Sequence, residues 1–207
     1  PAERLRELER HRALVAQRDD LAVEYGTLLL QAERADEALA LATTRKFQPW
    51  EGGEGLARGL FVRAHLALGR RALAAGAAAE ALDHFSSALT SPENLGEARH
   101  LLANSADVYY WLGCAHAARG EKAAARAAWR RAAESGGDFQ EMRVTAFSEQ
   151  TYFIARAREK LGRAAAARKL FRELLAHARQ LRRAPAKIDF FATSLPTMIL
   201  FEDDLPR

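Results

Sequence analysis

A tryptophan and two carboxylates lie close together in the stretch RKFQPWEGGEG, residues 45–55 of a 207-residue chain. They are Trp50, Glu51 and Glu54. An indole ring can stack on the flat face of a sugar ring, while carboxylates accept protons from its hydroxyl groups. Two carboxylates at a suitable separation can also act as acid and base in glycoside hydrolysis. The stretch is therefore a candidate contact for a ligand or for another domain, and catalysis is a third possible reading.

A purely structural explanation of the same stretch is also open. Pro49 cannot continue a preceding helix, and the three glycines allow backbone angles that other residues avoid. Glu51 and Glu54 come just before the next expected helix, whose N-terminal dipole favours negative charge. Phe47 and Trp50 could seal the gap between two pairs of helices. On this reading the stretch is a junction, and a functional role would need further evidence.

Other residue types with chemical potential form no recognisable site. The six histidines show neither His-x3-His nor His-Glu-x2-His spacing, so we predict no metal site. The single cysteine, Cys114, has no evident catalytic partners, and it excludes a disulfide within the chain. We therefore predict no catalytic residue and no cofactor, and we expect a reducing, cytoplasmic location.

Composition predicts an all-α protein. Hydrophobic residues make up 49% of the chain and charged residues 28%, and the bulk is Ala, Leu, Arg and Glu, which favour helices. No run of about 18 apolar residues is present, so we expect no membrane partner. The net charge is +4 and the pI about 9.5, but the positive charges alternate with glutamates. Nucleic-acid binding therefore rests on the pI alone, and we do not expect it.

The helices that would position these side chains repeat along the chain. Four segments align on a central alanine, at residues 38, 81, 125 and 167. The position twelve before it holds a small residue in each segment: Gly26, Gly69, Gly113 and Ala155. The position five before it, where glycine would end a helix, holds Glu33, Gly76, Gly120 and Gly162. The position four after it holds Ala42, Phe85, Trp129 and Phe171, and the position seven after it holds Arg45, Ala88, Ala132 and Leu174.

This pattern resembles the tetratricopeptide repeat. The resemblance implies a right-handed α-solenoid of about four helical hairpins. The repeat period is 42–44 residues, compared with about 34 in the ordinary repeat, so extra residues recur at one edge, near 45–58, 90–104, 134–147 and 179–195. We expect a single domain, residues 1–207. Its parts are an N-terminal helix at 1–18, repeats at 19–58, 59–104, 105–147 and 148–183, and a C-terminal cap at 184–207.

Three motifs suggest a narrower resemblance, covering about residues 19 to 205. RKFQPWEGGEG, SPENLGEAR and KIDFFATSLPTMILFEDDL are similar to motifs of large bacterial proteins. In those proteins a β-sandwich that resembles galactose-mutarotase domains precedes long-period tetratricopeptide repeats. The resemblance implies that this chain is the repeat portion of a larger protein whose missing N-terminal domain handles carbohydrate. Arg45 and Ala155 depart from the wider repeat pattern.

Helical phase predicts which side chains could bind a partner. The first helix of each hairpin would line an inner groove that takes peptides, or that is merely solvated. The predicted groove residues are Arg63, Arg70, Asp107, Tyr110, Tyr152 and Arg156. We therefore expect a non-catalytic scaffold for a protein segment or for the chain's own missing domain. The alternative is an accessory module that completes a carbohydrate site of that domain. The apolar segment 188–201 would cap the last hairpin or form a dimer contact.

Overall fold

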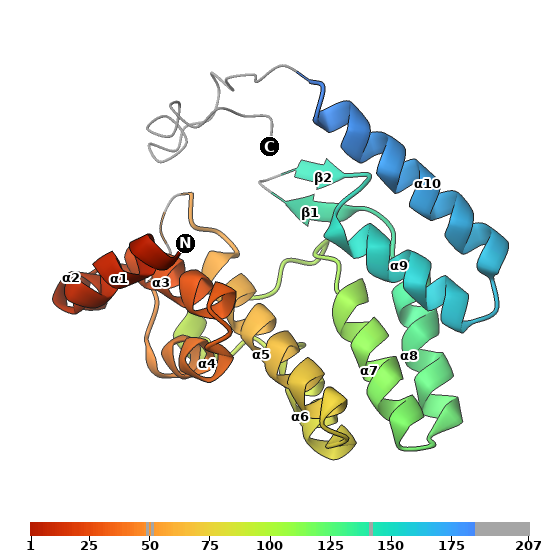
Figure 1. Ribbon diagram of the computed structural model, residues 1–207, viewed down its shortest axis with the longest axis horizontal. Coiled ribbons are helices and arrows are strands. Elements are labelled where there is room, and N and C mark those ends of the chain that lie inside the picture. The colour runs from red at the N-terminus through yellow and green to blue at the C-terminus, as the bar shows by residue number, and fades with distance from the viewer. Residues whose placement is uncertain (49, 51, 141–142, 185–207) are drawn as a thin grey trace.

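The computed structural model describes residues 1–48, 50, 52–140 and 143–184, and these are largely α-helical (Figure 1). The all-α prediction is confirmed. The first helices are α1 (Ala2–Arg10), α2 (Arg12–Gln17), α3 (Asp19–Gln31), α4 (Ala35–Thr44) and α5 (Leu56–Ala74). The others are α6 (Ala78–Ser87), α7 (Ala106–Ala118), α8 (Lys122–Glu134), α9 (Glu149–Lys160) and α10 (Ala164–Leu181). No helix within these ranges is both long enough and apolar enough to cross a membrane.

Two short elements lie between the helices. A 3-10 turn, η1 (Glu93–Leu95), precedes α7, and a two-stranded antiparallel hairpin precedes α9. Its strands β1 (Asp138–Gln140) and β2 (Arg143–Thr145) pair Asp138 with Thr145 and Gln140 with Arg143. Sequence reasoning missed this hairpin because three-residue strands are too short to show an alternating pattern.

Eight of the helices form four successive hairpins: α3–α4, α5–α6, α7–α8 and α9–α10. Each turn contains one residue with a positive φ, at the position five before the central alanine: Glu33 (61°), Gly76 (81°), Gly120 (77°) and Gly162 (79°). Glycine adopts this left-handed conformation without strain. At Gly76, the helix-ending bond runs from the N–H of Ala77 to the carbonyl of Ala72, at 2.9 Å. The repeat alignment therefore located all four turns, including the one in which glutamate replaces glycine.

The hairpins are arranged in two layers. Every helix from α3 to α10 packs against its neighbours in the chain, and α3, α5, α7 and α9 also contact one another in that order. We call these four helices the A layer, and α4, α6, α8 and α10 the B layer. Figure 1 shows the hairpins following one another from the N-terminal helices to α10. The core lies mainly between the two layers, and its largest fully buried side chains are Phe47, Phe85, Leu29, Leu60, Leu95 and Val108.

Small residues permit the close approach of helices at three of the aligned positions. A Cβ at Gly69 would come within 2.5 Å of Phe85, and one at Gly113 within 2.3 Å of Trp129. In both cases the glycine faces the aromatic residue of its own hairpin, as the repeat pattern predicts. In the first hairpin the contact differs, because a Cβ at Gly26 would meet Leu60 of the next hairpin, at 2.5 Å.

The N-terminal boundary differs from the prediction. Residues 1–18 form two helices rather than one, separated at His11 (φ −107°, ψ 37°). Arg45, which departs from the repeat pattern, holds this region in place. Its Nε donates to Asp19 at 2.6 Å, and its Nη1 donates to the carbonyl of Ala16 at 2.9 Å. An arginine therefore replaces the small core residue because it joins the first hairpin to the carbonyl end of α2.

Two further boundaries bear on the predicted domain division. The second repeat was expected to begin at residue 59, but α5 begins at Leu56, so the junction is three residues shorter than predicted. The proposed C-terminal cap, residues 184–207, and its apolar segment 188–201 lie outside the described residues except for Ala184.

Candidate functional site

The segments that join consecutive hairpins are held together by hydrogen bonds. We call residues 45–55 the first connector, 88–105 the second and 135–148 the third. The N–H of Phe47 donates to the carbonyl of Asn94 at 2.7 Å. The side chain of Asn94 donates to the carbonyls of Ala42 and Arg45, both at 2.8 Å. Because these carbonyls belong to the end of α4 and the residue after it, Asn94 caps that helix from the next connector.

Glu97 of the second connector caps the opposite side of the same junction. One carboxylate oxygen accepts from the N–H of Gly55 at 2.6 Å, and the other from the N–H of Arg58 at 2.8 Å. These are donors that the start of α5 leaves without a partner in the helix. We expected Glu51 and Glu54 to complement this helix N-terminus. Instead Glu97 does so, Glu54 is exposed, and Glu51 lies outside the described residues.

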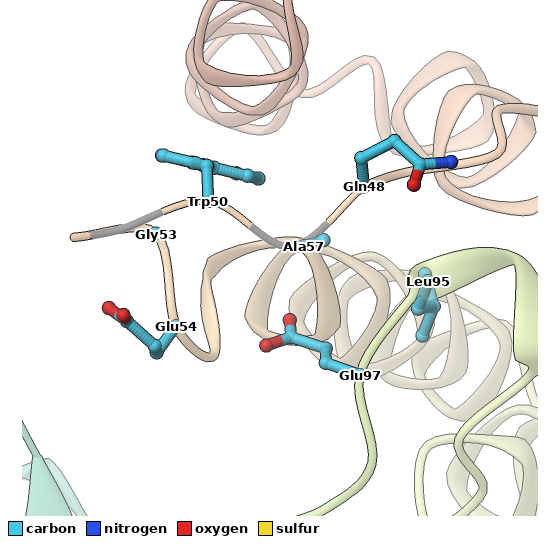
Figure 2. Close-up of a pocket in the computed structure, with 7 residues that line it drawn as sticks. All are labelled: Gln48, Trp50, Gly53, Glu54, Ala57, Leu95 and Glu97. Carbon is cyan, nitrogen blue, oxygen red and sulfur yellow. The ribbon is translucent and has the colours of Figure 1, made fainter.

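A hollow of about 320 Å³ lies between the first and second connectors (Figure 2). Trp50, Glu54 and Ala57 line it from the first connector and the start of α5, and Leu95 and Glu97 line it from the second connector. Gln48 and Gly53 complete the lining. A hollow of this size is within the range of small-ligand sites. The motifs RKFQPWEGGEG and SPENLGEAR therefore form one structural unit with a hollow between them.

The three glycines of the first connector have separate structural roles. Gly52 and Gly55 have φ values of 78° and 80°, which only glycine adopts freely. Gly53 has no side chain because the indole of Trp50 occupies that space, and a Cβ there would come within 1.9 Å of the ring. The glycine content of the loop therefore follows from its backbone path and from the position of Trp50. It is not independent evidence of a binding loop.

The polar groups around this hollow differ in whether they are free to bond to a ligand. Both oxygens of Glu97 are engaged with backbone donors, whereas Glu54 and Gln48 are exposed. Trp50 is half-buried and packs in part against the core of the first hairpins. An indole, an exposed carboxylate and an exposed amide thus line the hollow, and Figure 2 shows the carboxylate of Glu54 and the amide of Gln48 pointing away from each other. Glu51, the second carboxylate that acid–base catalysis in this loop would need, lies outside the described residues.

A second set of predicted residues lies on the A layer, and contacts between hairpins connect its members. The Nη2 of Arg63 on α5 donates to the hydroxyl of Thr27 on α3 at 3.2 Å. The guanidinium of Arg70, also on α5, lies 5.2 Å from the ring centre of Trp111 on α7. Such a cation–π contact positions the charge without neutralising it. Trp111 itself is half-buried and lies directly beneath this predicted groove arginine.

The position of Tyr110 differs from the prediction. Its side chain is only 5% exposed and packs against the rings of Trp111 and Phe153, so it does not form an open contact surface. Its hydroxyl accepts from Nη2 of Arg156 on α9 at 3.5 Å. Burial raises the pKa of Tyr110, and the hydrogen bond to the hydroxyl raises the pKa of Arg156. Tyr110 therefore positions Arg156 instead of contacting a partner itself.

Tyr152 is the exposed aromatic side chain of this surface, and 45% of its area is accessible. Its ring packs edge-on against Phe153 at 5.2 Å and lies 5.8 Å from Phe171. Asp107 is half-buried in the first turn of α7, where its side chain accepts from the N–H of Val108 at 2.7 Å. Asp107 therefore acts partly as a helix-start residue. The surface formed by Thr27, Arg63, Arg70, Trp111, Tyr152 and Arg156 is called the A-layer face below.

The hollow between the connectors and the A-layer face have no residue in common. The described residues of both also lack the ligand groups of a metal site. Across the described ranges, no group of three or more His, Cys, Asp or Glu side chains is placed to hold a metal ion. Cys114 is half-buried on α7, and burial raises the pKa of its thiol. A raised pKa keeps the thiol protonated at neutral pH, which disfavours a nucleophilic role.

The A-layer face and the hollow between the connectors are thus two separate candidate sites. No protein-family model matches the sequence, and no solved structure matches the chain. The resemblance to tetratricopeptide-repeat proteins, and to the repeat region of larger bacterial proteins, therefore stays a prediction.

Proposed function

We propose that the chain is a non-catalytic interaction scaffold. In this proposal its hairpins form a right-handed, tetratricopeptide-like α-solenoid, and the A-layer face binds an extended or helical protein segment. The segment belongs to a partner or to another domain of the same protein. Solenoids of this kind use the concave side of the stack to bind such segments.

The packing of the two layers supports a curved stack. The A-layer helices contact one another across successive hairpins. In the described part of the chain, the B-layer helices make at most sparse contacts with each other. Helices α4, α6 and α8 each pack instead against the A helices on either side, and α10 packs against α9. Successive hairpins are therefore closer on the A side than on the B side. A stack with this spacing curves toward its A layer, which makes the A-layer face the inner surface.

The observation that carries the proposal is the continuity of the A-layer face. Contacts link α3 to α5 through Arg63, α5 to α7 through Arg70, and α7 to α9 through Arg156. Each of these arginines retains donors that its present contacts do not use. An exposed tyrosine, Tyr152, lies at the α9 end. Tyrosine and arginine are the side chains that most often dominate protein-binding surfaces.

Peptide binding tests this proposal. The purified chain is probed with an array of short peptides that includes segments encoded upstream in the same reading frame. We expect saturable binding that Tyr152→Ala weakens about tenfold, since an exposed aromatic anchor contributes more than 1 kcal/mol. Leu101→Ala is the control, because Leu101 is 97% exposed on the second connector. The A-layer face is not the binding surface if neither Tyr152→Ala nor Arg156→Ala changes the affinity.

The hollow beside Trp50 favours a second candidate function. An indole next to a free carboxylate and an amide matches the two sides of a sugar, one apolar and one rich in hydroxyls. In this alternative the chain is an accessory module, and its first two connectors complete a carbohydrate-binding site with a neighbouring β-sandwich domain. The observation that favours it is the position of Trp50, which lines the hollow while remaining half-buried.

Sugar binding separates this candidate from the first one. Monosaccharide and oligosaccharide titrations, followed by isothermal titration calorimetry, should show saturation. Trp50→Ala should weaken it about tenfold, because stacking on the ring is lost, and Glu54→Gln should weaken it less. Glu51→Gln is included because Glu51 belongs to the predicted loop. Leu56→Ala, at an exposed position beside the hollow, should have no effect. Equal titrations for Trp50→Ala and the unchanged chain would leave the first connector as a junction only.

A further inference from the structure

Two cations of the A-layer face, Arg63 and Arg70, have no carboxylate within ion-pair distance among the described residues. Helix α5 contains four arginines and no acidic residue. Two of these arginines are used elsewhere: Arg58 donates to Ser91 of the second connector at 3.0 Å, and Arg71 makes two bonds to Asp36 at 2.7 and 2.8 Å. Arg63 and Arg70 point to the A-layer face, and in the described part of the chain neither forms an ion pair. Among the described residues, no carboxylate pairs with these two cations of the face.

In the N-terminal part of the chain, several cations form ion pairs with carboxylates. There Arg4 pairs with Glu24, Arg34 with Glu9, and Arg45 with Asp19, each at 2.6 Å. In the later hairpins, two cations lie over aromatic rings. Arg70 lies over Trp111 at 5.2 Å, and Lys160 lies over Trp129 at 5.6 Å. A cation held over a ring keeps its charge and its outward N–H donors, so it is positioned for an external carboxylate.

The guanidinium of Arg63 is partly desolvated and has no close carboxylate among the described residues. Within the described ranges, its Nη2 donates to the hydroxyl of Thr27 and to no carboxylate. The surrounding protein desolvates the guanidinium and lowers its pKa, while Glu149 on α9 opposes this shift. A partly desolvated cation without a close counter-ion interacts more strongly with an incoming carboxylate than a fully solvated one does.

The acidic residues near this face lie at one end of it. Asp107 and Glu149 are in the first turns of α7 and α9. In contrast, Arg70 lies in the last third of α5, and Arg156 and Lys160 lie in the second half of α9. Glu159 pairs with Arg156 at 3.5 Å and offsets part of this charge. Arg70, Arg156 and Lys160 therefore lie toward the C-terminal ends of their helices, whereas Arg63 lies nearer the middle of α5.

We infer that the segment bound by the A-layer face is an acidic protein segment, whose carboxylates contact Arg63 and Arg70. This inference rests on the scaffold function proposed above. A single-stranded nucleic acid fits the face less well, because base stacking needs free ring faces. The ring of Trp111 stacks on Phe85 at 6.2 Å and lies beneath Arg70, and Trp129 is 9% exposed.

Matched peptides and two neighbouring arginines test the inference. The probes are pairs of short peptides that differ only in having Asp and Glu or Asn and Gln. We expect the acidic member of each pair to bind the tighter. Arg70→Glu should weaken its binding about fivefold or more, and Arg70→Gln by less, because reversal adds repulsion to the lost attraction. Arg71→Glu is the control, since it makes the same charge change at an exposed residue that pairs with Asp36. Circular dichroism establishes that all three variants are folded.

Each outcome has a distinct meaning. If acidic and amide peptides bind equally well and Tyr152→Ala still weakens both, the scaffold function stands and the acidic partner is wrong. If no peptide binds saturably, both proposals fail. Equal losses for Arg70→Glu and Arg71→Glu would mean that net charge governs binding, not this face. Displacement of the acidic peptide by a single-stranded oligonucleotide at equal concentration would likewise overturn a protein segment as the partner.

Discussion

Replacing Phe47 with alanine should lower the free energy of unfolding by about 3 to 5 kcal/mol, as is typical for a fully buried phenylalanine. Its ring is 1% exposed and belongs to the core shared by the first two hairpins. The guanidinium of Arg45 lies 5.5 Å from the ring centre, and the backbone N–H is bonded to Asn94. The substitution would therefore leave a cavity where two hairpins and the second connector meet.

Trp50→Ala is the matched comparison, because the two aromatic residues belong to one connector and differ in burial. Trp50 is only half-buried and lines an open hollow. Trp50→Ala should therefore lower the free energy of unfolding by about 1 to 2 kcal/mol less than Phe47→Ala does. Urea denaturation of both variants gives the two values. A loss for Trp50→Ala as large as that for Phe47→Ala would mean that Trp50 is a core residue, and it would remove the stacking platform from the sugar-binding candidate.

The helical hairpins could be predicted from the sequence because close packing demands particular residue sizes at fixed spacing. Gly69 and Gly113 stand where Phe85 and Trp129 approach, and Gly76, Gly120 and Gly162 stand where the chain turns with positive φ. These demands are local, within one hairpin, and they repeat. The alignment therefore identified Glu33 as the equivalent turn residue, although glutamate itself gives no turn signal.

The connectors could not be predicted because their contacts are between distant parts of the sequence. Asn94 bonds to carbonyls about fifty positions earlier, and Glu97 bonds to N–H groups about forty positions earlier. The sequence gives no local sign of which carboxylate will reach a given helix end. Proximity along the chain favoured Glu51 and Glu54. Of the two, Glu54 is described and is exposed, and Glu97 accepts the two N–H groups at this helix start. The same limit applies to the hollow, whose two sides come from different connectors.

The A-layer face was predicted in part. Helical phase located Arg63, Arg70 and Tyr152 on exposed positions. It also assigned Tyr110 to the surface, where the structure buries it. Helical phase assigns the same exposure to equivalent positions in every repeat. However, α7 packs between α5 and α9, and the ring of Phe153 packs against Tyr110. Burial at such a position depends on the size of the neighbouring side chains, which the repeat pattern does not specify.

A buried histidine, His65, and its half-buried partner His84 should make the second hairpin sensitive to acid. The Nδ1 atoms of His65 on α5 and His84 on α6 are 3.0 Å apart, so one ring must donate to the other. His65 is 8% exposed, and Phe61 packs edge-on against it at 4.5 Å. Asp36, which is within electrostatic reach of His84, is paired with Arg71, and Glu80 is 4.0 Å from Nε2 of His84. No carboxylate among the described residues contacts His65 itself to stabilise its protonated form.

Burial, with a smaller contribution from His84, lowers the pKa of His65 from 6.5 to about 4. The unfolded chain therefore takes up a proton at a higher pH than the folded chain does. The stability linked to His65 is fully present above about pH 6.5 and is lost as the pH falls toward 4. A shift of this size corresponds to about 3 kcal/mol.

His65→Gln, whose amide can still bond to His84 but does not titrate, should lose this part of the pH dependence even though it is less stable at neutral pH. Urea midpoints measured across this pH range give the difference, and His11→Gln, at an exposed histidine, should keep the acid sensitivity of the unchanged chain. Parallel losses of stability in the unchanged chain and in His65→Gln would show that other groups cause the acid sensitivity. A flatter profile in His65→Gln alone would assign it to the contact between α5 and α6, the two helices of the hairpin that presents Arg63 and Arg70.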